Sequence, residues 1–231
     1  MFKFALGGEK GDLGKSLGYN NDMRGFVPEN AKLIPEEATC VFTGKIYDVY
    51  QWPQKMYDGS IETFEMLRRA DTVKIIGVVT ETEVKTLRNV GYESGAGDKI
   101  IITRQVQPRK DWFYDYPGGR VDMADKNELA AAKREMREET GLEFRNWKLV
   151  EVHQPFTKID WLVYTFVATG LVRQQEQELD AGEKIEVLAA TLEEINEFAK
   201  SEDSIYLRFK GFEKTQSIEE ILAKPVLFNY E

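Results

Sequence analysis

Three glutamates stand at a spacing that places them on one face of a helix. Residues 130–142 read AAAKREMREETGL. Within that run, Glu135, Glu138 and Glu139 occupy positions i, i+3 and i+4, so in a helix their carboxylates share one turn and repel one another. They also precede Gly141, a residue type that often ends helices, and negative charge is disfavoured at a helix C-terminus. A hard divalent cation would offset both penalties, because it binds carboxylate oxygens together with water and substrate phosphates.

The order of the residues distinguishes a metal site from an acidic face in solvent. In the second case the glutamates pair with Lys133, Arg134 and Arg137, and each such pair is worth roughly a few tenths of a kcal/mol. Residues 134–142, however, read REMREETGL and fit the pattern R-E-U-x-E-E-x-G-U, where U is a bulky aliphatic residue. This order resembles the second half of the Nudix box, the signature of the Nudix hydrolases. We therefore favour the metal site.

The first half of that signature departs from the family pattern, G-x5-E-x7-R-E. Counting back from Arg134 places Lys126 at the position of the glutamate, and Gly119 lies one residue before the position of the glycine. One inserted residue in the preceding loop, with loss of the glutamate, explains both departures. Asp125 or Glu128 is the candidate substitute. In the family this glutamate mainly supports the geometry between loop and helix, so the departure concerns the shape of the loop more than the chemistry.

The elements predicted around the helix are those of an α+β protein. The helix is expected over residues 125–140, with Asp125 and Asn127 as candidate caps and Gly141 as its end. Alternating β-branched and aromatic residues predict strands over 40–52, 73–80, 99–107, 146–155 and 160–172, with one more candidate within 60–72. Residues 183–200 are typical of a strand followed by a helix with a Thr191–Glu194 capping box, and residues 217–224 of a last short helix. Residues 1–38 and 116–120 are expected to form loop and turn. Strands that flank one central helix predict an α/β/α sandwich with a mixed sheet.

The resemblance, which covers residues 70–200, implies an arrangement in two parts. Residues 71–231 would form a Nudix domain with a mixed β-sheet. Residues 1–70 would form an N-terminal extension and β segment, which in related enzymes helps to make a homodimer. The activity implied is hydrolysis of a diphosphate that links a nucleoside to another group, with Mg²⁺ or Mn²⁺ as the cofactor and a nucleoside monophosphate as one product.

The resemblance also assigns roles to the acidic helix. Glu135 and Glu139 match the principal metal ligands, and Glu138 matches a third ligand or a base that orients water. Arg134 would hold one of these acids in position. The backbone carbonyl of Gly118 matches a further metal ligand of related enzymes.

Segments on both sides of the helix resemble the ADP-ribose and nucleotide-sugar pyrophosphatases, and they carry the substrate assignments. Asp160, in the loop before a late strand, is the candidate base, and the acidic run 179–187 matches one that precedes the final strand. Trp52 is the candidate platform for adenine. The family often has an arginine where Gln107 stands, so the phosphate contact is assigned to Arg104 or Arg109. Gly119, in the loop before the helix, is a further candidate for substrate binding.

Composition restricts the partners and the chemistry. The chain has 231 residues, a net charge of -9 and a pI near 5.0, which argues against broad binding to nucleic acid or to an anionic membrane. One cysteine and one histidine nearly exclude a zinc site built on those residue types, and one cysteine cannot form an intramolecular disulfide. We expect a cytoplasmic enzyme that acts on a small nucleotide.

Two other functions stay open on the sequence alone. The missing glutamate of the signature is compatible with a nucleotide sensor that binds without cleaving. The segment GGEKGDLGKSLG near the N-terminus resembles a phosphate-binding loop, but Glu9 stands where the first glycine is required. We therefore interpret that segment as a solvated loop.

Overall fold

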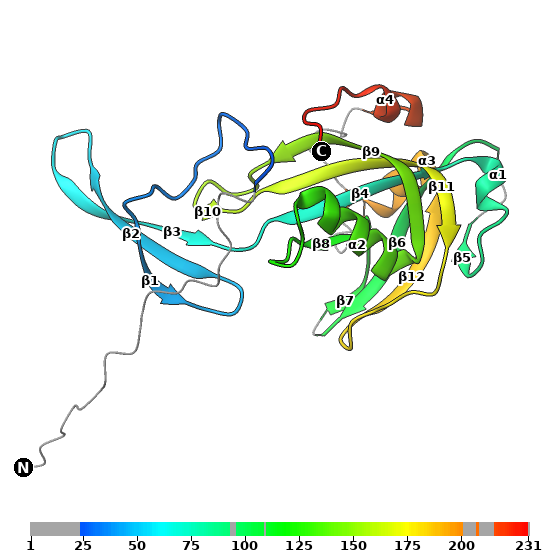
Figure 1. Ribbon diagram of the computed structural model, residues 1–231, viewed down its shortest axis with the longest axis horizontal. Helices are drawn as coiled ribbons and strands as arrows, with labels where there is room; N and C mark the ends of the chain where they lie inside the picture. The colour runs from blue at the N-terminus through cyan, green and yellow to red at the C-terminus, as the bar shows by residue number, and fades with distance from the viewer. Residues whose placement is uncertain (1–23, 93–95, 109, 201–206, 208–214, 231) are drawn as a thin grey trace, which may run out of the picture.

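The computed structural model describes residues 24–92, 96–108, 110–200, 207 and 215–230, and Figure 1 shows its elements in order. The strands are β1 Thr39–Thr43, β2 Asp48–Lys55, β3 Ile61–Arg68, β4 Thr72–Val79, β5 Val90–Gly91, β6 Lys99–Gln107, β7 Lys110–Asp115, β8 Gly118–Arg120, β9 Leu142–His153, β10 Ile159–Asp160, β11 Val163–Gln174 and β12 Lys184–Ala190. The helices are α1 Glu81–Val84, α2 Glu128–Thr140, α3 Leu192–Phe198 and α4 Ile218–Ala223. No helix in these ranges has the length and apolar character needed to cross a membrane.

A mixed sheet forms the centre of the molecule. Its strand order is β5-β12-β6-β4-β11-β9, with β7 paired to β6 and β8 paired to β4. Strands β4 and β11 run parallel, as do β12 and β5, whereas β6 pairs antiparallel with both of its neighbours, β4 and β12. The short strand β8 therefore holds the segment before helix α2 against the middle of the sheet.

The two faces of the central sheet are buried under different helices. Side chains alternate across a strand, so Val73 and Ile75 of β4 pack in the cluster that contains Met136 of α2, while Ile76 packs in the cluster that contains Ile195 of α3. The second cluster also includes residues of α4. Helices on both sides of a mixed sheet confirm the predicted α/β/α sandwich.

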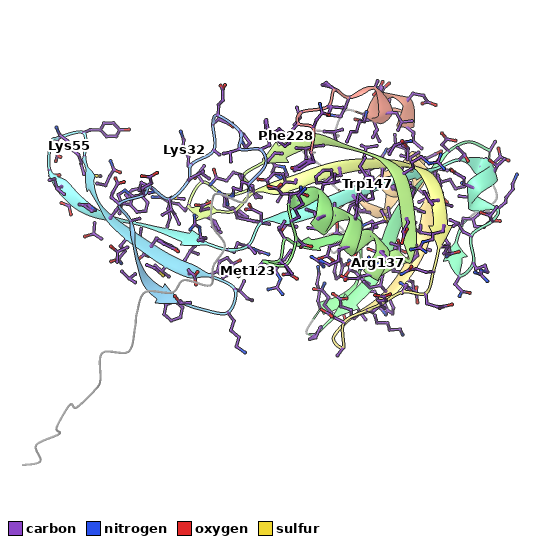
Figure 2. The ribbon with its side chains drawn as sticks, in the orientation of Figure 1. Lys32, Lys55, Met123, Arg137, Trp147 and Phe228 are labelled. Carbon is purple, nitrogen blue, oxygen red and sulfur yellow. The ribbon has the colours of Figure 1, made fainter. Side chains whose placement is uncertain are left out.

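A second sheet lies at the end of the molecule away from helix α2 (Figure 2, where Lys55 ends β2 and Arg137 lies on α2). Its strand order is β1-β2-β3-β10. Its buried core includes Tyr50, Trp52 and Met66. This is the expected N-terminal β segment. Strand β10 comes from residue 159 onward yet pairs with β3, so the sheet joins the two predicted domains instead of ending at residue 70.

Several element boundaries differ from the predictions. Helix α2 begins at Glu128, not at residue 125, because the side chain of Asn127 accepts the amide N–H of Ala130 and caps the helix there. The segment 40–52 divides into β1 and β2, and residues 118–120 form β8 where only a turn was expected. Strand β7 was not predicted. The capping box of Thr191 and Glu194 is confirmed at the start of α3, and the loop with Glu9 lies outside the described residues.

Candidate metal centre and substrate cavity

Helix α2 presents the three glutamates to strand β8. Gly141 ends the helix in the left-handed conformation, with φ of 72°, and its N–H donates to the carbonyl of Arg137 at 2.8 Å. Met136, on the helix face that packs against the sheet, is fully buried and fixes the rotation of the helix. The glutamates consequently face the turn between β7 and β8.

The glutamates lie around a cavity of about 230 Å³. Its lining combines three sources: the helix, the segment of β8, and the loop before β12. The lining residues are Gln105, Gln107, Asp115, Gly118, Gly119, Arg120, Asp122, Arg134, Glu135, Glu138, Glu139, Glu178, Asp180 and Glu183. The structure thus brings together Arg134, the three glutamates and both glycines of the sequence prediction.

Arg134 holds two of the glutamates and the preceding loop. Its guanidinium donates to Glu135 Oε1 and Glu138 Oε2, each at 2.9 Å, and to both carboxylate oxygens of Asp125 at 3.1 and 2.9 Å. It also donates to the carbonyl of Arg120 at 2.9 Å. Among these contacts the hydrogen bond to Asp125 contributes most to raising the pKa of Arg134, so the guanidinium stays charged. Of the two substitutes considered for the lost glutamate, Asp125 makes this contact.

Glu128, the other candidate substitute, has a different partner. Its side chain is fully buried and its Oε1 accepts the backbone N–H of Gly25 at 2.9 Å. Burial raises the pKa of its carboxyl. Glu128 therefore ties the start of the described chain to helix α2 and lies outside the lining of the acidic cavity.

Glu139 is the most deeply buried acid of the cavity. It is 5% exposed, and its Oε2 accepts the N–H of Gly118 at 2.9 Å. Burial raises its pKa well above the ordinary value, and the nearby charges of Glu135 and Asp115 add to this. Without a cation, a negative charge on this carboxylate is strongly disfavoured.

Glu135 lies directly over Gly119. A Cβ atom at position 119 would stand 2.4 Å from Glu135 Oε1, closer than real Cβ contacts, so the carboxylate occupies the space that any other residue type would fill. Burial raises the pKa of Glu135 to about 7, and the guanidinium of Arg134 opposes that shift. Gly119 serves to admit this carboxylate, a role that the sequence pattern alone did not assign.

The donor set fits a hard divalent cation. Buried carboxylates with raised pKa values are acids whose negative charge lacks compensation, and oxygen ligands of this kind are those that Mg²⁺ and Mn²⁺ take. Within the part of the chain that the structure describes, no group of three acids is already set around one point at metal-ligand spacing. Glu135 and Glu138 point to Arg134, so binding a cation requires small rotations of these side chains.

Acids from the loop before β12 complete the cavity. Glu178 N–H donates to the carbonyl of Glu138 at 2.9 Å, which fixes the loop to the end of α2. Asp180 and Glu183 line the cavity, and the charge of Glu183 contributes to the raised pKa values of Glu135 and Glu139. The acidic run 179–187 was noted in the sequence, but its place opposite the helix depends on the turn that joins β11 to β12.

Asp160 does not lie in this cavity, which argues against its prediction as the base. Its carboxylate is fully buried and pairs with Arg24 at 2.8 Å and Arg68 at 3.2 Å, and the N–H of Ile34 donates to it at 3.1 Å. Arg24 also pairs with Asp71 at 2.7 Å. An acid held this way links the N-terminal sheet to the central sheet and has no open side for a substrate water.

The predicted substrate-binding side chains are dispersed. Trp52 is 7% exposed and packs on Phe64 in the N-terminal sheet, with ring centroids 5.2 Å apart, so no face of the indole is open to adenine within this chain. Arg104 pairs with Glu186 at 2.9 Å and lies 4.4 Å from the ring of Trp112. Arg109 lies outside the described residues. Gln107, which stands where an arginine was expected, does line the cavity, as does Gln105.

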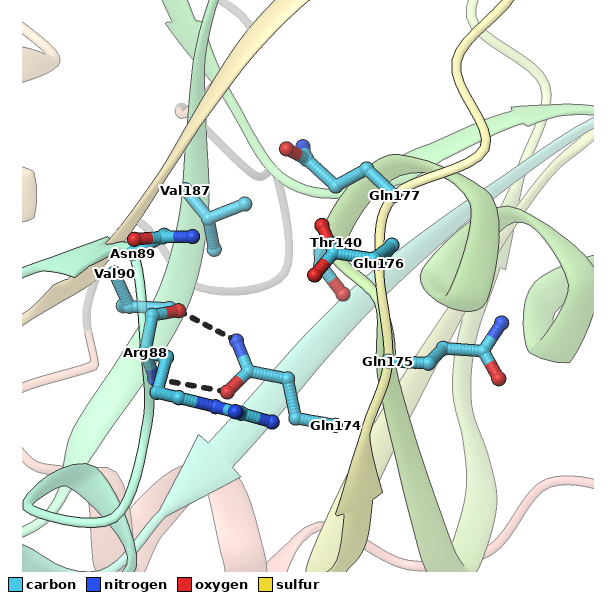
Figure 3. A pocket seen from close by; sticks show the side chains of 9 residues that line it. All are labelled: Arg88, Asn89, Val90, Thr140, Gln174, Gln175, Glu176, Gln177 and Val187. Atoms are coloured by element: carbon cyan, nitrogen blue, oxygen red, sulfur yellow. Dashed lines mark hydrogen bonds between the residues drawn. The ribbon is translucent and has the colours of Figure 1, made fainter.

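A larger cavity of about 610 Å³ lies beside the end of helix α2 (Figure 3). Gln174 and the backbone of Arg88 exchange two hydrogen bonds across it, at 2.8 and 2.7 Å. Thr140 belongs to its lining, but none of the sequence-predicted site residues does. It therefore adds space next to the acidic helix without adding carboxylates of the candidate metal centre.

Comparisons with known proteins agree with the fold. The family model described as NUDIX domain matches residues 92–209, which include helix α2 and the loop before β12. The ADP-ribose pyrophosphatase of Bacillus subtilis (strain 168) is 26% identical over 168 residues, covering 71% of this chain and 80% of that protein. A solved structure titled "Crystal structure of ADP compounds hydrolase" has a TM-score of 0.53 and 14% identity, covers 81% of this chain and 89% of that chain, and shows similarity of fold.

Proposed function

The chain belongs to the Nudix family, and from this we propose that it hydrolyses a nucleoside diphosphate linked to another group, with ADP-ribose or a nucleotide sugar as the substrate and Mg²⁺ or Mn²⁺ as the cofactor. The observation that carries the proposal is the set of three carboxylates of helix α2 around one cavity, with Glu139 deeply buried and Glu135 and Glu138 held by Arg134. The similarity to an ADP-ribose pyrophosphatase supports the substrate class.

Glu135, Glu139 and Glu138 would hold the cation, together with the carbonyl of Gly118. A bound divalent cation neutralises charge on the diphosphate and lowers the pKa of a coordinated water. Arg134 holds Glu135 and Glu138 beside the cavity, so a small rotation of each side chain brings it to a cation there. The amides of Gln105 and Gln107 can donate to phosphate oxygens without adding charge.

The overall reaction adds water to one phosphorus as the bridging P–O bond breaks, and one proton must leave the attacking water. Glu183 replaces Asp160 as our candidate acceptor of that proton. It lines the cavity opposite the helix, and no lysine or arginine of the described ranges lies within ion-pair distance of it. Glu138, in contrast, is bonded to Arg134, which suits a ligand or positioning role.

Glu139→Gln tests the site directly. We expect hydrolysis of ADP-ribose with Mg²⁺ to fall about 100-fold or more, because the amide cannot supply the buried negative charge that a cation requires. Glu143→Gln is the matched control: it follows the same helix, pairs with Arg173 at the surface and lies outside the cavity. Equal activity of wild type and Glu139→Gln would remove the assigned site.

The sensor alternative rests on the altered first half of the signature. Asp125 supplies the contact to Arg134 that keeps the loop in place, which favours an active enzyme. Tight binding of ADP-ribose, measured by calorimetry, without release of AMP in the presence of Mg²⁺ or Mn²⁺ would support the sensor instead.

A homodimer through the N-terminal sheet is the proposed assembly. Large apolar side chains of β1 and of the β1–β2 turn are exposed, including Val41 at 51%, Phe42 at 60% and Ile46 at 57%. Exposed apolar side chains gathered in one segment are typical of interaction sites. We expect Phe42→Glu to shift a dimer to a monomer in sedimentation, while Val172→Glu, an exposed position of the central sheet, leaves the mass unchanged. A monomeric wild type at micromolar concentration would exclude the dimer.

A further inference from the structure

A second, smaller cavity adjoins the acidic one and has the opposite charge. It measures about 210 Å³ and lies between the β1–β2 turn, the end of β3 and the loop before α2. Figure 2 shows Met123, one of its lining residues, between the N-terminal sheet and helix α2. Arg120 and Asp122 line both cavities, so the two spaces are direct neighbours.

The lining of this basic cavity carries an excess of positive charge. The charged residues that line it are Lys45, Arg68, Arg69, Arg120, Asp48 and Asp122. Four cations thus face two carboxylates, an excess of two formal positive charges in a protein whose net charge is -9. Such a local reversal of sign indicates a site for an anion.

Arg69 is the side chain that points to a specific ligand. Its Nε atom is buried without a hydrogen-bond partner, and no carboxylate of the described residues lies within ion-pair distance of its guanidinium. The guanidinium lies 4.5 Å from the ring centre of Trp161 and 5.8 Å from that of Tyr47. Trp161 is itself fixed by a 3.0 Å hydrogen bond to Thr72. Arg69 is therefore held in place by aromatic rings, and its Nε–H is left without an acceptor among the residues that the structure describes.

The neighbouring cations differ in how far they are already used. Arg68 pairs with Asp160 at 3.2 Å. Lys45 and Arg120 are exposed, and the described part of the chain gives neither of them an ion pair. Arginine and lysine donors arranged around an oxyanion are typical of phosphate sites, and a phosphate monoester carries about -1.5 to -2 charges at neutral pH.

The size of the cavity restricts what it takes. Pockets for whole small ligands measure roughly 300–1,000 Å³, whereas this one is about 210 Å³ and shares Arg120 and Asp122 with the lining of the candidate metal centre. It suits one substituent of a larger molecule that lies in the acidic cavity. Since a cation would already meet the charge of the bridging diphosphate there, the basic cavity remains for a further anionic group.

We propose that this basic cavity binds a phosphate monoester on the substrate, separate from the bridging diphosphate, so that the preferred substrate is a phosphorylated nucleoside diphosphate derivative. The inference rests on the proposed function for the orientation of the diphosphate. The phosphate can be carried on the adenosine ribose or on the linked group, and both sources share the same recognition by Arg69, Arg120 and Lys45.

The test compares binding of three compounds: ADP-ribose, its adenosine 2′-phosphate, and ADP-ribose 1″-phosphate. Dissociation constants are measured by ligand-detected NMR with a chelator present, so that binding is observed apart from hydrolysis. We expect one of the two phosphorylated compounds to bind wild type at least about tenfold more tightly than ADP-ribose. Which one binds tighter identifies the source of the phosphate. The proposal would be overturned by equal dissociation constants for all three compounds, or if neither phosphorylated compound binds measurably.

Variants assign the effect to the cavity. Arg69→Gln should reduce the ratio of the constants for ADP-ribose and the preferred phosphorylated compound to near one. Lys45→Gln, at an exposed turn position that carries no packing role, should reduce the ratio several-fold and keeps the test decisive if Arg69→Gln does not fold. Arg88→Gln removes one positive charge beside the larger cavity of about 610 Å³ and should leave the ratio of the dissociation constants unchanged. A ratio that survives both Arg69→Gln and Lys45→Gln contradicts the proposal.

Failure of the proposed function gives a different result. If the chain cleaves no diphosphate with Mg²⁺ or Mn²⁺ but still prefers a phosphorylated compound in the binding assay, the basic cavity stands and the hydrolase assignment falls. If ADP-ribose is cleaved while the phosphate brings no gain in affinity, the hydrolase assignment stands and the basic cavity is excluded.

Discussion

Substitution of the two adjacent glycines of β8 should separate a catalytic defect from a folding defect. In Gly119→Ala the new Cβ would lie 2.4–2.6 Å from the three carboxylate atoms of Glu135, the far end of a flexible side chain. An ordinary contact begins near 3.4 Å, so the carboxylate must move by about 1 Å. A displacement of that size at a catalytic group reduces the rate by about 100-fold.

Stability should change little in Gly119→Ala. Moving one side chain off its preferred rotamer costs about 0.5–1.5 kcal/mol, and the helix and strands keep their packing. In Gly118→Ala the new Cβ would instead lie 2.1 Å from the carbonyl oxygen of Val73, part of the backbone of β4. That contact cannot be relieved by a side-chain rotation, so β8 must separate from β4 and the free energy of unfolding should drop by several kcal/mol.

The assay combines initial rates of ADP-ribose hydrolysis with urea unfolding of both variants. The expected pattern is low kcat with nearly normal stability for Gly119→Ala, and low stability for Gly118→Ala. Gly119→Ala with activity within threefold of wild type would show that the position of Glu135 does not matter for the reaction. Unfolding of Gly119→Ala would show that the contact is not confined to a side-chain terminus.

Three further outcomes follow from the ion pairs and the buried acids. Arg134→Lys should lower kcat by about 10–100-fold, since one ammonium cannot replace a fork that binds two glutamates and a loop, whereas Arg137→Lys on the same helix should retain activity in the same rate assay. Arg24→Met should lower the free energy of unfolding in urea by about 3–5 kcal/mol because it takes the cation from the fully buried Asp71 and leaves Asp160 with Arg68 alone, whereas Arg173→Met, which breaks an exposed pair, should cost less than about 1 kcal/mol. Burial raises the pKa of Glu135 to about 7, so this carboxyl is mostly protonated at pH 6 and mostly ionised at pH 8. Mn²⁺ should therefore bind more tightly at pH 8, and calorimetry in two buffers of different ionisation enthalpy should detect the proton released on binding. An Mn²⁺ affinity that does not change with pH would contradict this expectation.

The acidic helix could be predicted because its information is local. Positions i, i+3 and i+4 define one helix face, and Asn127 and Gly141 mark the ends of the helix, so the geometry of the glutamates follows from one continuous segment, residues 127–141. The α/β/α sandwich could also be predicted, since strand β4 has apolar side chains on both faces and both must be buried by other elements. Short strands such as β8 and β10 were missed because they exist only through pairing with β4 and β3.

Asp160 shows why the rest of the site could not be predicted from local sequence. A loop acid before a strand has the same local pattern whether it binds water or an arginine, and its partners Arg24 and Arg68 are far from it in sequence. The same holds for Asp125, which the altered signature could only offer as one of two substitutes. Its role becomes clear when the structure places both of its carboxylate oxygens on Arg134. Asp125 stands one residue before the position of the family's glutamate, and from there it joins the loop to the charge of Arg134 on the helix.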